Sequence, residues 1–122
     1  MLTKYPIVAY VPASDIARAR RFYEQTLGFR AVGENPGGIA YESGGTRFFL
    51  YKTQFAGTNQ ASCAFWEVDD VPAEVKELKA KGVKFEDYDL PGMKTQDGMT
   101  PDGKAAWFKD TEGNIMAVIQ RR

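Results

Sequence analysis

The segment that determines the fold is 105-AAWFKDTEGNIMAVIQ-120. Two apolar runs with the composition of β-strands flank the polar stretch 110–114, in which Gly113 can supply the positive φ that a tight connection needs. The pattern predicts a hairpin of two strands, 105–109 and 115–120. An apolar run on each side of a polar turn is typical of the element that closes a sheet.

The first half of the chain begins with a strand and a helix. The apolar run 7–11 is followed by Ser14 and Asp15, which suit the N-cap of a helix over 16–27. Gly28 suits the end of that helix. Three short strands are then predicted, over 29–32, 39–42 and 47–51.

The second half repeats this pattern. Strand 63–68 is followed by Asp70, which can cap a helix over 72–81, and Gly82 suits the end of the helix. A strand over 83–85 and the hairpin of 105–120 follow.

The two halves therefore form an internal repeat with a period of about 55 residues. We expect a single domain over 1–122, in which each repeat is a β-α-β-β-β unit. Repeat one spans about 5–53, a polar linker spans about 54–62, and repeat two spans about 63–122.

Segment 87–104 is rich in turn residues and carries Leu90, Met93 and Met99. Loops of this length within a compact domain are usually functional lids or contain an irregular strand. We predict both for this segment.

Composition excludes several classes of protein. The chain has 122 residues, and no apolar run approaches the roughly 18 residues of a membrane span. Sixteen basic residues balance sixteen acidic ones, so no general attraction to nucleic acid is expected. With no signal-peptide pattern and one cysteine, we expect a soluble cytoplasmic protein with no nucleic-acid or membrane partner.

The chain has no histidine. Histidine is the commonest metal ligand and the usual acid–base group near neutral pH. Its absence rules out Ser-His and Cys-His nucleophile pairs and argues against a zinc or iron site. Any chemistry must use carboxylates, Lys, Tyr, Arg or Cys63.

Three groups of motifs occur in order along nearly the whole chain. They are Pro12-Ala13-Ser14-Asp15, Phe22-Tyr23 and Leu27-Gly28-Phe29, then Val68-Asp69-Asp70 and Leu78 to Gly82, and finally Trp107-Phe108-Lys109-Asp110 and Gly113-Asn114-Ile115. With these motifs the chain resembles the vicinal oxygen chelate superfamily, which includes glyoxalase I, bleomycin resistance proteins and extradiol dioxygenases. The resemblance implies an α+β fold in which the repeats form curved, mainly antiparallel half-barrel sheets around one pocket.

The metal-using members of this superfamily take ligands from four strand positions. The resemblance places these positions on Val8, about Phe49, Cys63 and Ala117. Three of these side chains offer no donor atom, and one thiolate is not a chelate. We therefore expect no metal and no cofactor.

If those four positions face inward, strand alternation indicates which other side chains line the pocket. A lining rich in aromatic rings suits a flat, largely apolar ligand. The predicted pocket residues are Tyr10, Tyr41, Phe49, Tyr51, Cys63, Phe65, Met99 and Trp107.

Three residues are candidates for catalysis: Glu67, Arg47 and Cys63. Glu67 and Arg47 could act as an acid–base pair, or they could lie in solvent at strand ends. Since no histidine can activate Cys63, we interpret it as a small buried hydrophobe.

Three functions are consistent with these features. The first is a metal-independent protein that binds an aromatic or drug-like molecule. The second is a metal-independent lyase or isomerase that uses Glu67, Arg47 or a tyrosine. The third is an accessory module with a vestigial pocket. The resemblance also implies a homodimer, since members of this length commonly pair.

Overall fold

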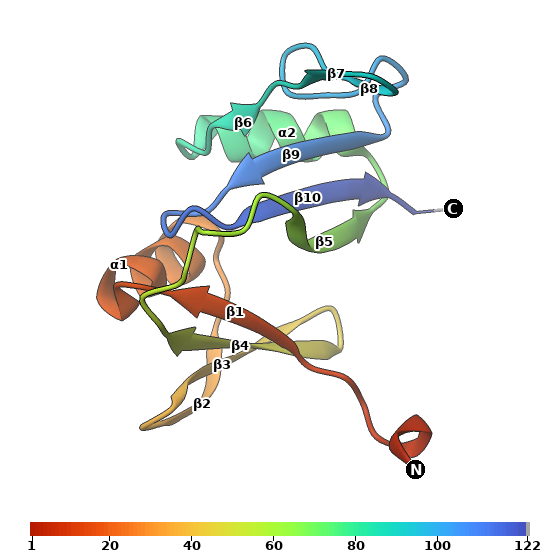
Figure 1. Ribbon diagram of the computed structural model, residues 1–122. Helices are drawn as coiled ribbons and strands as arrows, with labels where there is room; N and C mark the ends of the chain where they lie inside the picture. Colours follow the sequence, from red (N-terminus) through yellow and green to blue (C-terminus); the bar gives the residue numbers. More distant parts are fainter. Residues whose placement is uncertain (122) are drawn as a thin grey trace.

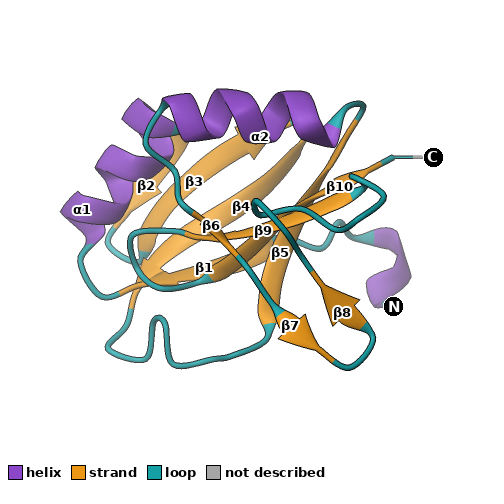
Figure 2. Ribbon diagram, turned by 90° about the horizontal axis from the view of Figure 1, so that it is seen from above, coloured by secondary structure: helices purple, strands orange, loops and turns teal. Residues whose placement is uncertain are grey.

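The computed structural model describes residues 1–121 as two four-stranded sheets with both α-helices on the same side (Figures 1 and 2). Neither helix in this range combines the length and the apolar character needed to cross a membrane. The elements, in chain order, are η1 (Leu2–Lys4), β1 (Ala9–Ala13), α1 (Ile16–Arg21), η2 (Phe22–Thr26), β2 (Ala31–Asn35), β3 (Gly38–Ser43), β4 (Thr46–Lys52), β5 (Ser62–Val68), α2 (Val71–Ala80), β6 (Phe85–Glu86), β7 (Asp89–Leu90), β8 (Met93–Lys94), β9 (Ala105–Lys109) and β10 (Ile115–Gln120).

The two sheets have the same topology. The first has the strand order β1-β4-β3-β2, and the second has the order β5-β10-β9-β6. In each sheet the first strand of the repeat pairs in parallel with the last, and the remaining pairs are antiparallel. The sheets do not close into a barrel. The predicted α+β fold is thus confirmed, and β9 and β10 coincide with the predicted hairpin.

Both helices begin at the predicted capping residues. The Asp15 carboxylate accepts a hydrogen bond from the Arg18 N–H at 3.0 Å, and the Asp70 carboxylate accepts one from the Ala73 N–H at 3.0 Å. Gly28, with φ of 83°, follows the first helical segment. The helix predicted over 16–27 is divided, because α1 ends at Arg21 and the chain continues as the π-helical turn η2.

One hydrophobic core joins the two repeats on the helix side of the sheets. Val11, Leu50 and Tyr23 enter it from repeat one, and Phe108 and Met116 enter it from repeat two. Trp66 lies between two other rings, in near-parallel stacks. Its ring centroid is 5.8 Å from that of Phe29 and 6.1 Å from that of Phe108. Aromatic packing therefore crosses the boundary between the repeats.

A second contact between the repeats is polar and centres on Glu112, in the β9–β10 turn. Its fully buried carboxylate accepts hydrogen bonds from the backbone N–H groups of Ser14 and Asp15 at 3.0 and 2.9 Å. The Arg18 guanidinium donates to it as well, with Nε 2.8 Å from Oε2. We call this set of contacts the Glu112 clasp. It fixes the turn of repeat two to the start of α1 in repeat one.

Asp110 shapes the turn that carries Glu112. Its Oδ1 accepts hydrogen bonds from the N–H groups of Glu112 and Asn114, each at 2.9 Å. Its Oδ2 accepts a 2.6 Å hydrogen bond from the Tyr23 hydroxyl, which comes from repeat one. Burial, together with the adjacent Asp110 carboxylate, raises the pKa of Tyr23, so its hydroxyl remains a donor.

The linker between the repeats packs against the same turn. A Cβ placed on Gly57 would lie 2.5 Å from the Glu112 carbonyl oxygen, and φ at Gly57 is 74°. Only glycine combines that conformation with so close an approach. The linker is thus held at the Glu112 clasp.

Segment 87–104 contains the short strands β7 and β8, in agreement with the irregular strand predicted within it. The Asp87 carboxylate organises the segment, because it accepts hydrogen bonds from the Thr95 hydroxyl at 2.9 Å and from the Gly98 N–H at 2.8 Å. Met99 forms a bridge to Ala106 of β9. The segment is therefore attached to the outer part of the second sheet.

We expect Glu112→Gln to lower the free energy of unfolding by about 3 kcal/mol, the usual cost of breaking one side of a buried ion pair. The amide keeps the shape of the side chain but removes its charge. It also turns an NH2 group toward N–H donors. Urea denaturation at neutral pH measures the change. Glu77→Gln is the control, because Glu77 forms an exposed pair with Lys81 and should change stability by less than about 1 kcal/mol.

The effect of Glu112→Gln should also depend on pH. Burial alone would raise the pKa of Glu112, but the hydrogen bonds from Arg18, Asp15 and Thr111 outweigh it and lower the pKa to about 2. This stabilisation is complete above about pH 4.5, the unfolded value, and is lost as the pH falls toward 2. The difference in the free energy of unfolding between wild type and Glu112→Gln should therefore become smaller as the pH falls from about 4.5 to about 2. A difference independent of pH would contradict the role of the charge.

Candidate functional site

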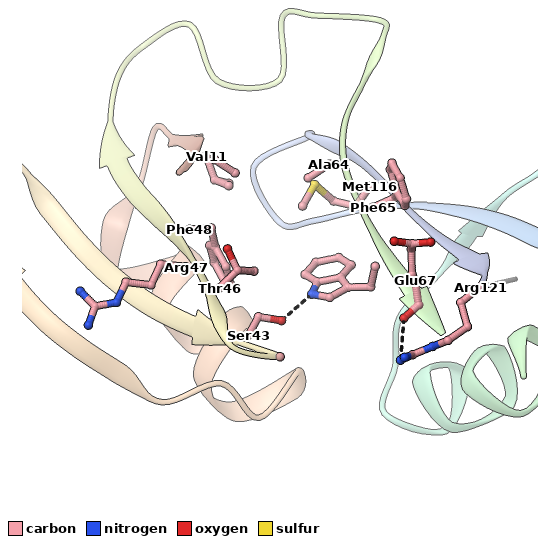
Figure 3. Close-up of a pocket in the computed structure, with 13 residues that line it drawn as sticks. Val11, Ser43, Thr46, Arg47, Phe48, Ala64, Phe65, Glu67, Met116 and Arg121 are labelled. Atoms are coloured by element: carbon pink, nitrogen blue, oxygen red, sulfur yellow. Dashed lines mark hydrogen bonds between the residues drawn. The ribbon is translucent and has the colours of Figure 1, made fainter. Parts of the chain in front are cut away.

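A cleft with a volume of about 680 Å³ lies between the two sheets (Figure 3). It lies between β1 and β5, the neighbouring edge strands of the two sheets. The end of β1 adjoins repeat two, where Asn114 Nδ2 donates to the Pro12 carbonyl at 2.8 Å. The beginning of β1, at Ala9, lines the cleft. The sheets are thus held together at one end of these edges and separate at the other.

The floor of the cleft is apolar and its walls are more polar. Val11 and Phe48 reach the floor from the first sheet, and Ala64 and Met116 reach it from the second. One wall is formed around the β3–β4 turn and the other along β5 and the end of β10 (Figure 3). The wall residues are Ser43, Gly44, Thr46 and Arg47 on the first side, and Phe65, Glu67 and Arg121 on the second.

Trp66 joins the two sides of the cleft. Its indole Nε1 donates a 3.0 Å hydrogen bond to the Ser43 hydroxyl, so a side chain of β5 reaches the β3–β4 turn (Figure 3). The bond satisfies the polar end of a ring whose faces pack in the core. Trp66 thereby fixes the distance between the two walls at this point.

Each wall carries a charged group that is available to a ligand. Arg47 and the Glu67 carboxylate form no ion pair with another residue of the described chain, 1–121. Figure 3 shows them on opposite sides of the cleft, with the Arg47 guanidinium directed outward. Arg121 is occupied, because its Nε lies 2.9 Å from the Asp69 carboxylate. An apolar molecule in the cleft could thus bind polar groups at either rim.

The structure brings together three of the predicted site residues: Phe65, Glu67 and Arg47 all line the cleft. Phe65 is 56% exposed, so its ring is available for contact. This agrees with the alternation of β5, in which Trp66 faces the core while Phe65 and Glu67 point the other way.

Four predicted aromatic residues lie outside the cleft, on the sides of the sheets that face away from the helices. We call these sides the open faces. Tyr10, Phe49 and Tyr51 form a cluster on the first sheet, with the Tyr10 ring centroid 4.0 Å from that of Tyr51 and 5.8 Å from that of Phe49. Trp107 contacts Tyr88 on the second sheet, at 6.1 Å between centroids. These residues flank the cleft without lining it.

Tyr41 and Met99, which were also predicted to line the pocket, lie outside the cleft. Tyr41 pairs in register with Phe48, so it faces the core, where it is fully buried and its hydroxyl donates to the Glu24 carboxylate at 2.8 Å. Met99 packs against the core through its bridge to Ala106. Neither residue lines the cleft, since strand pairing turns both toward the helix side.

Cys63 is exposed, contrary to the prediction of a buried residue. Its neighbours Ser62 and Ala64 pair with consecutive residues of β10, so Cys63 lies at an irregularity of the ladder. Its thiol turns toward the Met116 sulfur at 3.3 Å. The partial burial of the thiol and the Asp110 carboxylate raise the pKa of Cys63, which disfavours the reactive thiolate.

The residues at the four metal-ligand positions do not fit a metal ion. Val8, Phe49 and Ala117 have no donor atoms, and the Cys63 thiol is directed at Met116. Within residues 1–121, no three His, Cys, Asp or Glu side chains gather in a way that could hold a metal. The donor set is therefore wrong for the metal chemistry that the resemblance would imply.

The matching family model decides the relationship of this chain to known proteins. It is described as "Glyoxalase/Bleomycin resistance protein/Dioxygenase superfamily" and matches residues 6–118. The chain belongs to this superfamily. The resemblance noted in the sequence is thus confirmed. A search of curated proteins gave no significant match.

Solved structures of this superfamily are similar over almost the whole chain. TnmS3, an antibiotic binding protein from Streptomyces sp. CB03234, is 26% identical with a TM-score of 0.68, and the match covers 98% of each chain. A bleomycin-binding protein in complex with bleomycin is 18% identical with a TM-score of 0.71, and the match covers 96% of this chain and 98% of that one. Lactoylglutathione lyase from Agrobacterium tumefaciens is 21% identical with a TM-score of 0.65, covering 95% and 93%. The last two likenesses establish the fold alone.

We expect the purified protein to contain no stoichiometric Zn, Ni, Mn or Fe, because the four ligand positions lack a donor set. Elemental analysis by plasma mass spectrometry, after incubation with each metal and gel filtration, measures the content. One metal ion per chain that survives a chelator would contradict this expectation.

Proposed function

We propose that this chain is a metal-independent binding protein for an aromatic or drug-like molecule, which it holds in the cleft between the sheets. The observation that carries the proposal is the cleft itself. Its volume of about 680 Å³ lies within the range of roughly 300–1,000 Å³ that is usual for small-molecule sites. Its apolar floor can hold a ring, and its polar walls can orient the ligand, as in other small-molecule sites.

The superfamily relationship supports the proposal without naming the ligand. TnmS3 is described as an antibiotic binding protein, and another similar structure contains bleomycin. Sequestration needs a pocket and no catalytic group. Phe65 offers an exposed ring on one wall, with Arg47 and Glu67 as polar anchors at the rims.

We expect a panel of aromatic antibiotics and metabolites to yield a compound that raises the melting temperature. Phe65→Ala should lower the affinity for that compound about tenfold, because a ring buried by a ligand commonly contributes more than about 1 kcal/mol to binding. Calorimetric titration measures the affinity. Phe55→Ala is the matched control, since Phe55 is 67% exposed and lies outside the cleft.

Three outcomes would contradict the proposal of a binding protein whose site is the cleft. If no compound binds, the accessory module with a vestigial pocket becomes the better interpretation. If Trp107→Ala weakens binding and Phe65→Ala does not, the ligand lies on the open face of the second sheet. If a bound compound is turned over, and Glu67→Gln or Arg47→Gln stops the turnover while binding persists, the protein is a lyase or isomerase.

We also propose that the chain forms a homodimer. Six of the large exposed hydrophobic residues lie within the first ten residues, namely Met1, Leu2, Tyr5, Ile7, Val8 and Tyr10. Figure 1 shows residues 1–8, which we call the N-terminal arm, extending away from both sheets. Tyr10 follows the arm as part of β1. Exposed apolar side chains on a single extended segment are typical of a protein–protein contact. A second copy that packs on the arm would cover them around a two-fold axis.

Ile7→Glu should convert the dimer into a monomer, because Ile7 is 92% exposed in the single chain and the charge would be buried only in the pair. Light scattering at tens of micromolar protein measures the mass. Leu90→Glu is the control, since Leu90 is 55% exposed but lies on the distant β7–β8 hairpin. A wild-type mass equal to one chain would remove the proposal.

A further inference from the structure

A second, smaller cavity lies on the helix side of the second sheet. It is a groove of about 170 Å³ between α2 and the segment that follows η2. Leu78 of α2 forms one side, Leu27 and Phe29 of repeat one form the other, and Phe108 forms part of the floor. Because its walls come from both repeats, the groove exists only in the folded chain.

The size and lining of the groove suit a single aromatic ring. An apolar cavity of about 150 Å³ can hold benzene, so a groove of about 170 Å³ accommodates one ring with a short substituent. Phe29 and Trp66 stack with 18° between their planes and present a continuous aromatic surface. Phe108 stacks on the other side of Trp66, so the three rings form a row. A ligand ring placed beside them would extend this row.

One ionisable side chain lines the groove, and it is acidic. Glu74 precedes Leu78 by four residues on α2, so both lie on the same side of the helix. The Glu74 side chain is half-buried, and it forms no ion pair or hydrogen bond with any other side chain of residues 1–121. A partly desolvated carboxylate beside an apolar surface favours a cation and disfavours an anion.

We propose that this groove is a second ligand site, separate from the cleft, which binds a small aromatic ammonium compound. The ring occupies the apolar groove and the ammonium group lies against the Glu74 carboxylate. Trp66 separates the two sites, since its side chain lines both the cleft and the groove. This site does not depend on the function proposed for the cleft.

Three compounds of the same shape and different charge test the proposal. In calorimetric titrations, 2-phenylethylamine should bind about fivefold more tightly than neutral 2-phenylethanol, the scale of a partly exposed ion pair. The anion phenylacetate should bind more weakly than either. Glu74→Gln should lower the affinity for the amine to that for the alcohol and leave the affinity for the alcohol unchanged. Glu77→Gln, on the same helix but outside the groove, should leave all three affinities unchanged.

Several outcomes would overturn the proposal. These are equal affinity for the three compounds, no binding of any of them at millimolar concentration, or the same loss of affinity for the amine in Glu77→Gln as in Glu74→Gln. Leu78→Phe, which fills the groove, should abolish binding of all three. If that variant does not fold, the comparison of Glu74→Gln with Glu77→Gln still decides. Loss of amine binding in Phe65→Ala, with Glu74→Gln unaffected, would place the amine in the cleft.

Discussion

The arrangement of the two repeats depends on the hydrogen bonds and the ion pair that the buried Glu112 carboxylate forms. Its side chain has no exposure to solvent, and backbone N–H groups and the Arg18 guanidinium of repeat one surround it. A buried charge is stable only where such partners are complete. The β9–β10 turn can therefore hold one position against α1, and Asp110 adds a second link through Tyr23. Both links hold the turn of repeat two against the first helical segment of repeat one.

The two repeats are alike in topology but differ at the corresponding turns. The turn of repeat two, between β9 and β10, carries Glu112 and forms the clasp. The turn of repeat one, between β3 and β4, carries Gly44 and Gly45 and has no side chain that could form a similar contact. There, the Ser43 hydroxyl accepts one hydrogen bond from Trp66. The sheets meet at the end with the charged clasp and separate at the other, and this asymmetry produces the cleft.

The site residues show where reading the sequence succeeds and where it fails. Alternation along β5 correctly predicted that Phe65 and Glu67 face away from the core, because one strand determines its own pattern. Tyr41 was assigned to the wrong side because its face depends on its pairing with Phe48, and a shift of one residue reverses every side chain of a strand. Val11, Phe48 and Met116 gave no signal at all. They are core residues that reach the cleft only because the sheets separate there.

The sequence by itself determined the local features of this protein: the hairpin of 105–120, the caps at Asp15 and Asp70, and the repeat that relates the two halves. These depend on neighbouring residues and on backbone preferences that a single stretch of chain expresses. Only the tertiary structure decided how the repeats meet. Glu112 and Ser14 are far apart in the chain, and neither the clasp nor the cleft and groove on either side of Trp66 can be derived from spacing. Such contacts depend on the relative position of two sheets, which is set by packing between them.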